Sequence, residues 1–422
     1  MSMVRKGLAF AAILMVAFAG YAWFVDNRGA DDVDGTDGPL HQSGASVERG
    51  EYLAAAADCV ACHTVAGQGD FAGGLEFRLP FGTIYSSNLT SDPVTGIGSW
   101  TDAEFLRAVR GGVGRGGRHL YPAHPYTSYS AMARNDVLAI RAYLASVPPI
   151  SNQIPSGELR FPYSQRWLMP LWNALFLSNS RFQADGRHSE TWNRGAYLAT
   201  ALGHCGECHT PRNFAYGLRY GRALTGAITQ GWRAYDITAG VSALGSWTDA
   251  AVTEYLATGH AAGHGSATGP MKQVVAFSTG RLRPEDRSAL VDYLVAGRSR
   301  TGAAIATATT AVDGAAVPGK LGARLYAGAC AGCHPLDPSG GTGPYSNLTG
   351  ASSVRDSQGT NVLRLLAVGS PHGIDTGAVM PDFGSGYTDT ERAALANFVL
   401  AQWGHTSAGL TPNDARRARL LD

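Results

Sequence analysis

The stretch Cys59-Val60-Ala61-Cys62-His63 recurs as Cys205-Gly206-Glu207-Cys208-His209 and as Cys330-Ala331-Gly332-Cys333-His334. These three copies contain all six cysteines of the 422-residue chain. In the pattern C-x-x-C-H, the two thiols add across the vinyl groups of a haem, and the adjacent histidine binds the iron. The sequence therefore predicts three covalently bound haem c groups, with His63, His209 and His334 as proximal iron ligands.

Other uses of paired cysteines fit this pattern less well. A zinc site needs further ligands at compatible spacing, and no cysteine outside the motifs is left to supply them. A thioredoxin-like dithiol is one motif in a βαβ setting, not three copies each followed by histidine. Structural disulfides would not place every cysteine pair at the same spacing.

The composition argues against a strongly charged partner. The net charge is about +1, so no overall field favours nucleic acid, and no nucleic-acid partner is expected. The chain contains 54 glycines, which is typical of small domains built from short helices and tight loops around a bulky group.

An apolar run at the N-terminus predicts export. It covers residues 7–25, after Arg5 and Lys6 and before several aspartates. Its length approaches the ~20 residues that span a bilayer, and the flanking charges place the rest of the chain outside the cytoplasm. A cleaved signal peptide is the alternative, because Ala17-Phe18-Ala19 resembles a cleavage site. Both interpretations predict export, and the location we expect is the periplasmic side of the inner membrane.

Internal repeats follow the motifs. The hexapeptide at 98–103 recurs unchanged at 245–250, which indicates internal duplication. In both copies a Thr-Asp pair predicts a helix start, and the helices are expected to end near Gly111 and Gly259. In the third copy, the equivalent helix is expected over 362–368 and to end at Gly369. A last helix is expected at 136–146, 284–296 and 389–402.

The fold class expected from these repeats is all-α, with three tandem class I cytochrome c domains behind a membrane anchor or signal peptide. An aromatic-rich linker is expected to pack on the domains or on a partner, and an Ala/Thr/Gly-rich linker is expected to be flexible. The expected segments are 1–25 (anchor or signal), 26–45 (flexible tether), 46–148 (domain 1), 149–190 (packed linker), 191–298 (domain 2), 299–318 (flexible linker), 319–405 (domain 3) and 406–422 (C-terminal tail).

Two methionines are candidates for the sixth iron ligand of the second and third haems. Met271 follows Pro270, and Met380 precedes Pro381, in matched loops before the last helix of each domain. A proline-bearing loop can hold a thioether over a haem, as in cytochromes c. The alternative is that each methionine only fills a core.

The first domain differs at this position. His124 lies as far after Trp100 as Met271 lies after Trp247, so the repeat places histidine where methionine is expected. We expect His124 to ligate the first haem. Met132 is one alternative, and an open or exchangeable iron is the other. A histidine pair gives a lower iron potential than histidine with methionine.

Several further segments resemble a known family. They lie at 81–88, 121–123, 192–198, 203–205, 208–213, 269–271 and 380–381. The chain resembles, from about residue 47 to 404, the tri-haem cytochrome c subunits of membrane-bound, quinone-reducing dehydrogenases for alcohol, gluconate, sorbitol, fructose or aldehyde. In that family, methionine often stands at the position of His124.

The resemblance implies an electron-transfer subunit without a catalytic site of its own. It would carry electrons from a periplasmic dehydrogenase catalytic subunit to ubiquinone or a terminal oxidase. Two other functions stay open from the sequence: a free-standing, membrane-tethered carrier, and a haem enzyme that uses an open first haem.

Overall fold

The computed structural model describes residues 16, 20–21, 44–240, 244–297, 320–336, 346–370 and 380–420. The chain divides into two compact units, one formed by 1–207 with 214–218 and the other by 208–213 with 219–422. Most of the expected anchor and tether and all of the 299–318 linker lie outside the described residues. Among the residues that are described, no helix has the length and apolar character needed to cross a membrane. The boundaries of the three repeats stay a prediction.

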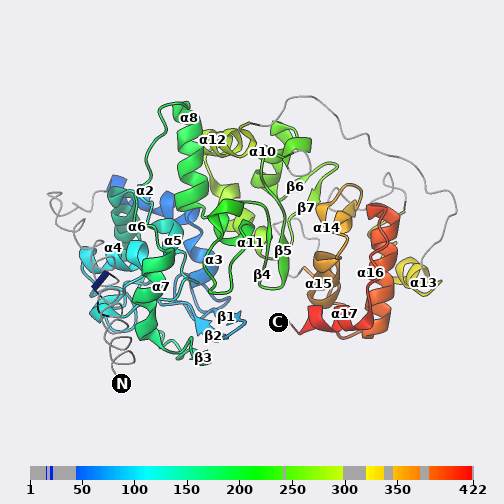
Figure 1. Ribbon diagram of the computed structural model, residues 1–422, viewed down its shortest axis with the longest axis horizontal. Helices are drawn as coiled ribbons and strands as arrows, with labels where there is room; N and C mark the ends of the chain where they lie inside the picture. Colours follow the sequence, from blue (N-terminus) through cyan, green and yellow to red (C-terminus); the bar gives the residue numbers. More distant parts are fainter. Residues whose placement is uncertain are drawn as a thin grey trace, which may run out of the picture. The chain divides into compact units, whose positions relative to one another are not determined.

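The first unit is built on a pair of crossing helices, α2 (Gly44–Ala56) and α6 (Arg134–Ser146), drawn in blue and cyan in Figure 1. At the crossing, a Cβ on Gly50 would lie 1.9 Å from the carbonyl oxygen of Ala139. Only glycine therefore allows this close approach. Short helices complete the unit, namely α3 (Cys59–His63), α4 (Asp102–Gly111), α5 (Tyr126–Tyr129), α7 (Met169–Phe176) and α8 (Glu190–Tyr197).

Local signals explain where α4 begins and ends. The Thr101 hydroxyl accepts a bond from the backbone N–H of Glu104, and the Glu104 carboxylate accepts one from the backbone of Thr101. This reciprocal capping satisfies donors that the first helical turn leaves unpaired. Gly112 ends the helix in the left-handed conformation, with φ of 65°.

The expectation of an all-α fold is wrong, because the described residues also form three small antiparallel sheets. In the first sheet, β1 (Glu76–Leu79) pairs with β2 (Gly82–Tyr85), and β2 pairs with β3 (Glu158–Leu159). Exposure alternates along β1, as expected for a strand with one solvated face. The strand β3 belongs to the expected 149–190 linker, so part of that segment packs within the first unit.

The second unit contains the other two sheets, each a short hairpin. The strands β4 (Ala227–Thr229) and β5 (Trp232–Ala234) are joined by Gln230 and Gly231, both at positive φ. Two positive φ values in a two-residue turn match the twist of a hairpin. The second hairpin pairs β6 (His260–Ala261) with β7 (Gly265–Ser266). Helix α10 (Asp249–Thr258) packs against β6 and against α11 (Pro270–Phe277) and α12 (Pro284–Val295).

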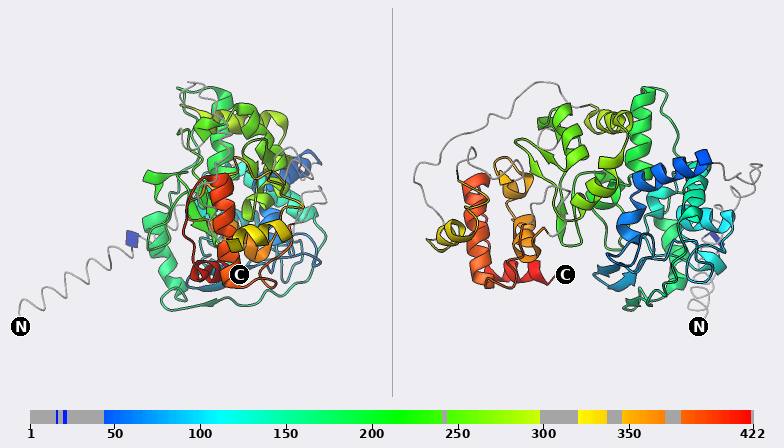
Figure 2. Two further views of the ribbon diagram at one scale, coloured as in Figure 1. Left: turned by 90° about the vertical axis from the view of Figure 1, so that its right-hand side faces the viewer. Right: turned by 180° about the vertical axis from the view of Figure 1, so that it is seen from behind.

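The C-terminal part of the second unit repeats the crossing-helix arrangement. Helix α13 (Lys320–Ala329) lies beside α16 (Asp389–Gly404) in both views of Figure 2. A Cβ on Gly322 would lie 2.3 Å from the carbonyl oxygen of Ala394. The core here includes Tyr326, Leu395 and Phe398, and it is closed by α14 (Ser352–Arg355) and α15 (Thr360–Val368).

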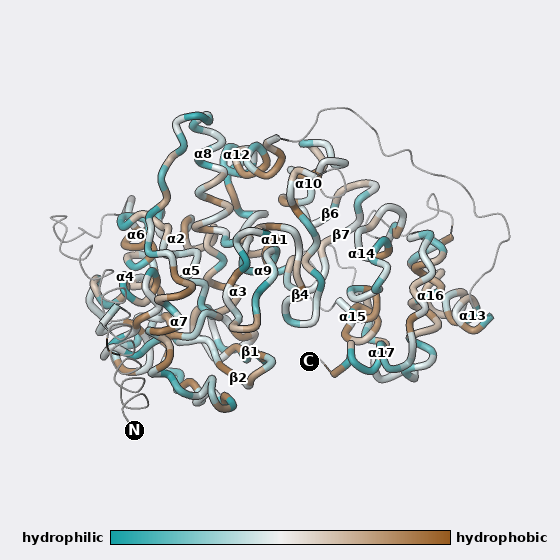
Figure 3. The backbone as a smooth tube through the Cα atoms, viewed as in Figure 1, coloured by the Kyte–Doolittle hydropathy of each residue, from teal (hydrophilic) through white to brown (hydrophobic). Residues whose placement is uncertain are grey.

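The segment expected only as a C-terminal tail contains a helix, α17 (Pro412–Arg419). It is largely hydrophilic (Figure 3), but its small residues Ala415 and Ala418 are buried in the core around Tyr326, Leu395 and Phe398, here called the third core. Arg364 of α15 donates a hydrogen bond to the carbonyl of Ala418. The tail therefore belongs to the packed structure.

The helices predicted from the repeats are confirmed within two residues at each end. These are α4, α10 and α15 as the middle helices, and α6, α12 and α16 as the last helices. Thr101, Thr248 and Thr388 each cap a helix N-terminus through their hydroxyls.

Candidate haem sites

Each C-x-x-C-H motif lies at or just after the end of a helix. Cys59 to His63 form α3, which begins after Asp58 in the left-handed conformation. Gly206 to His209 form α9. Cys330 to His334 follow α13 in a turn that the Tyr326 hydroxyl stabilises by donating to the carbonyl of His334. All six cysteines are described, and none of them forms a disulfide.

The same hydrogen bond recurs at the three motif histidines. The Nδ1 atoms of His63, His209 and His334 lie 2.7, 2.6 and 2.6 Å from the backbone carbonyl oxygens of Ser87, Tyr235 and Ser346. A carbonyl accepts only, so each Nδ1 carries a proton, and Nε2 is the nitrogen that bears the lone pair when the ring is neutral. A metal-binding histidine is usually oriented in this way by a second partner.

Burial favours the neutral form of two of these rings. It lowers the pKa of both His63 and His209, because a charged imidazolium loses hydration away from water. A neutral ring with a free Nε2 is the form that binds a metal.

His124 is close enough to His63 for the two rings to interact electrostatically. Burial, with the neighbouring His63 and His204 rings, lowers the pKa of His124 to about 3. The His124 ring lies 5.5 Å from the Tyr129 ring, centroid to centroid. The alternative ligand, Met132, is fully buried between α5 and α6.

The two methionines of the other repeats lie at structured positions. Met271 occupies the first turn of α11, behind Gly269, which has a φ of 54°. A Cβ on Gly269 would come within 2.4 Å of the Trp232 indole, so this turn requires glycine. Met380 pairs with Ser370 in a β-bridge and packs against the third core.

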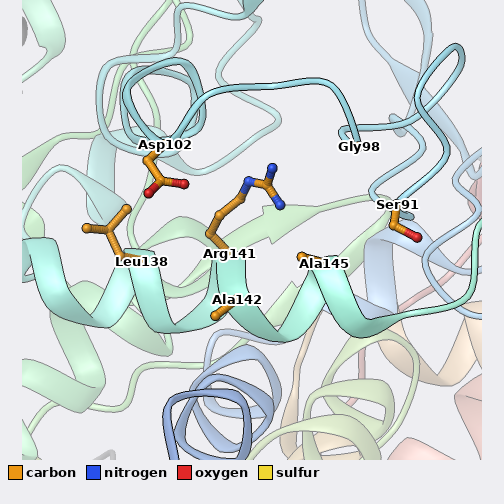
Figure 4. A pocket seen from close by; sticks show the side chains of 7 residues that line it. All are labelled: Ser91, Gly98, Asp102, Leu138, Arg141, Ala142 and Ala145. Atoms are coloured by element: carbon orange, nitrogen blue, oxygen red, sulfur yellow. The ribbon is translucent and has the colours of Figure 1, made fainter. Parts of the chain in front are cut away.

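A surface pocket of the first unit lies between α6 and the loop before α4 (Figure 4). Arg141 extends from α6 toward this loop, and its guanidinium donates a 2.9 Å bond to the Trp100 carbonyl. Ser91 and Asp102 line the same pocket. Because Arg141 holds the loop that leads into α4, we interpret this pocket as structural.

The residues present fit a covalently bound haem. Haem c requires paired cysteines on one helical turn and a neutral histidine with a free Nε2 as its donor set, and small or apolar neighbours around it. Among the described residues, no group of three or more His, Cys, Asp or Glu side chains is arranged to hold a bare metal ion.

Comparison with known proteins agrees with this donor set. The family model described as cytochrome c matches residues 47–148, and that described as cytochrome C oxidase, cbb3-type, subunit III matches residues 318–399. The fructose dehydrogenase cytochrome subunit of Gluconobacter japonicus is 35% identical over 410 residues, which cover 89% of this chain and 82% of that protein. The chain belongs to the cytochrome c subunits of dehydrogenases.

Two other relatives extend this comparison. The cytochrome c subunit of alcohol dehydrogenase (quinone) from Gluconobacter oxydans is 33% identical, with 89% of this chain and 82% of that protein covered. A nicotinate dehydrogenase subunit of Pseudomonas putida is 41% identical over 85% of this chain, which spans only 30% of that longer protein. The cytochrome c subunits of this family transfer electrons rather than act on the substrate, and covalent haem c is their cofactor.

Sequence reasoning missed the carbonyls that orient the three histidines. Ser87, Tyr235 and Ser346 contribute main-chain atoms, which leave no residue-type signature. It also assigned no role to His204, which adopts a φ of 37° immediately before Cys205 in this cytochrome c subunit. Its place directly before a motif, within a segment (203–205) that carries the family resemblance, is the signal in the sequence.

Proposed function

We propose that this cytochrome c subunit holds three haem c groups, here numbered 1 to 3 from the first motif to the third. The six cysteines would form the thioethers, and His63, His209 and His334 would bind the irons. The recurrent bond from histidine Nδ1 to a main-chain carbonyl carries the proposal, because it prepares Nε2 identically at three places.

We propose His124, Met271 and Met380 as the sixth ligands. A bound haem c supplies a one-electron carrier whose potential depends on its axial ligands and burial. The chain's own contribution is to orient the ligands and to exclude water. Asp136 joins α6 to α8 by accepting a 2.7 Å bond from Tyr197.

The partner would be a dehydrogenase catalytic subunit on the periplasmic side of the inner membrane. The names of the fructose, alcohol and gluconate dehydrogenase relatives support such a partner. The acceptor would be ubiquinone or a terminal oxidase. One relative's name includes quinone, which favours the first acceptor. The apolar N-terminal run would hold the subunit at the membrane.

The deciding experiment is gentle solubilisation of native membranes, isolation of this chain, and identification of the proteins that co-purify. We expect a stoichiometric dehydrogenase subunit and three haems per chain. A Cys205→Ala/Cys208→Ala variant should contain one haem fewer and serves as the calibration of the haem count.

Two results would contradict parts of this proposal. Repeated isolation of the chain alone, with all haems present, would identify a free-standing carrier. Carbon monoxide binding to the reduced protein would identify an open iron, since a six-coordinate low-spin iron resists it, and would contradict a full set of three sixth ligands.

A further inference from the structure

Three functional segments of the first unit meet at one tyrosine. Tyr129, at the end of α5, is 6% exposed, and its hydroxyl donates a 2.7 Å bond to the carbonyl of Ala57. Ala57 stands two residues before Cys59 of the first motif. The Tyr129 ring also lies 5.5 Å from the His124 ring and 5.5 Å from the His204 ring.

The contact with His204 leads directly to the second motif. His204 precedes Cys205, and the two rings meet edge to face, at an interplanar angle of 75°. Such T-shaped pairs are a favourable geometry for aromatic rings. The His204 ring also bonds the carbonyl of Ala57, so this one acceptor receives both Tyr129 and His204.

The backbone before Cys205 is shaped to place His204 there. A π-helical turn, η3 (Leu198–Leu202), lets the N–H of Gly203 reach the carbonyl of Leu198 at 2.6 Å. The N–H of Cys205 then bonds Ala199 at 3.0 Å. Single π-turns inside helices often occur at functional positions.

A second connection joins the same two segments. Glu207, inside the second motif, is 9% exposed and accepts bonds from the hydroxyls of Thr127 at 2.6 Å and Ser128 at 2.9 Å. Both hydroxyls belong to α5, the helix that follows His124 and ends at Tyr129. Hydrogen bonds to a charged acceptor are stronger than neutral ones, so α5 is held firmly against the second motif.

We propose that Tyr129 and His204 form the route by which electrons pass between haem 1 and haem 2, and that Glu207 positions this route. The inference rests on the proposed function, since it needs haems at the first and second motifs. Electron tunnelling through bonded and closely packed groups is faster than across gaps, and Tyr129 contacts residues of both sites.

Tyr129 and His204 lie on the route, and Glu207 is the positioning residue. The electron that one haem iron would lose is the one that the other would gain, so Tyr129 itself would be neither oxidised nor reduced. The Tyr129 hydroxyl keeps its bond to the Ala57 carbonyl, which fixes the ring between the two motifs.

The test measures electron redistribution inside the full-length, haem-loaded protein. A photoexcited ruthenium tris(bipyridine) complex reduces the haems rapidly, and the absorbance bands then report relaxation between them. The phase that involves haem 1 is the one whose amplitude changes in His124→Met. Tyr129→Leu removes the bridging ring, and Tyr126→Leu is the matched control. Tyr126 lies in the same helix and is fully buried, but its hydroxyl donates to Asn173 of α7.

We expect Tyr129→Leu to slow the haem 1 phase several-fold, with three haems per chain and three unchanged midpoint potentials. Tyr126→Leu should leave the rate of the haem 1 phase unchanged. If Tyr129→Leu does not retain its haems, His204→Leu removes the other ring and must slow the same phase. The proposal is overturned if the haem 1 phase keeps its rate in a variant, Tyr129→Leu or His204→Leu, that retains three haems and unchanged midpoint potentials. Fewer than three haems in the unaltered protein would instead contradict the proposed function.

Discussion

Lys272 donates a 2.9 Å hydrogen bond from Nζ to the Ser370 hydroxyl. Lys272 follows Met271 directly, and the N–H of Ser370 bonds the carbonyl of Met380 at 2.8 Å. One lysine therefore joins the two segments that carry the proposed methionine ligands of the second unit. Burial lowers the pKa of Lys272, because its charge is partly removed from water.

We expect Lys272→Leu to lower the free energy of unfolding of the second unit by about 1 kcal/mol. The substitution removes a hydrogen bond from a charged group, which destabilises the fold. It also removes a half-buried charge, which offsets part of that loss. Urea unfolding followed by circular dichroism measures this change. Lys320→Leu is the control, since Lys320 is exposed at the start of α13. A double-mutant cycle with Ser370→Ala isolates the pair, and a coupling energy of zero would show that the bond contributes nothing.

A second prediction concerns Asn361, at the beginning of α15. Its side chain accepts a 2.8 Å bond from the N–H of Arg233 and donates a 3.0 Å bond to the Arg233 carbonyl. It is 3% exposed. Asn361→Leu removes the hydrogen-bond partner of the Arg233 N–H and of the Arg233 carbonyl in β5. We therefore expect the free energy of unfolding to fall by roughly 2–4 kcal/mol.

Asn135→Leu is the control for this change, because Asn135 is exposed on α6. It should alter the unfolding free energy by no more than about 0.5 kcal/mol. Equal effects of the two substitutions in urea titrations would contradict the role assigned to Asn361. Asn361 also donates to the Tyr235 hydroxyl, and the Tyr235 carbonyl accepts from His209. Haem retention at the second motif is therefore a useful second measurement.

The two glycine crossings give a prediction with a control in the same helix. In α13, an alanine Cβ at Gly322 would meet the Ala394 carbonyl, whereas a Cβ at Gly328 would meet nothing within 4 Å. Gly322→Ala should cost about 1–3 kcal/mol through overpacking. Gly328→Ala should instead stabilise the helix by roughly 0.5–1 kcal/mol. Thermal unfolding of the two variants should shift in opposite directions; a shift in the same direction would exclude close contact at the crossing.

The helices were predictable because their signals are local. Thr101, Thr248 and Thr388 precede apolar-periodic runs, and glycines end all three middle helices. The hairpins were not predicted, although alternation in β1 and the Gln230-Gly231 turn were present in the sequence. Their strands are short, so the loops were interpreted only as irregular segments around a haem.

The contacts between repeats could not be predicted, because they depend on pairs that are distant in the sequence. Nothing at Asn361 indicates Arg233, and nothing at Glu207 indicates Thr127. The repeat alignment did identify His124 as a candidate ligand, and in the structure its ring interacts electrostatically with His63. Its ligation stays a prediction.

The last prediction tests that ligation directly. We expect His124→Met to raise one of three midpoint potentials by on the order of 0.1 V and to leave the other two in place, because a thioether stabilises ferrous iron relative to imidazole. Spectroelectrochemical titration of the full-length protein measures all three. Met132→Leu is the control: Met132 is fully buried, and leucine of similar volume should cost less than about 1.5 kcal/mol without moving any potential. If His124→Met changes nothing and Met132→Leu shifts one potential, Met132 is the ligand, and the proximity of His124 to His63 reflects packing alone.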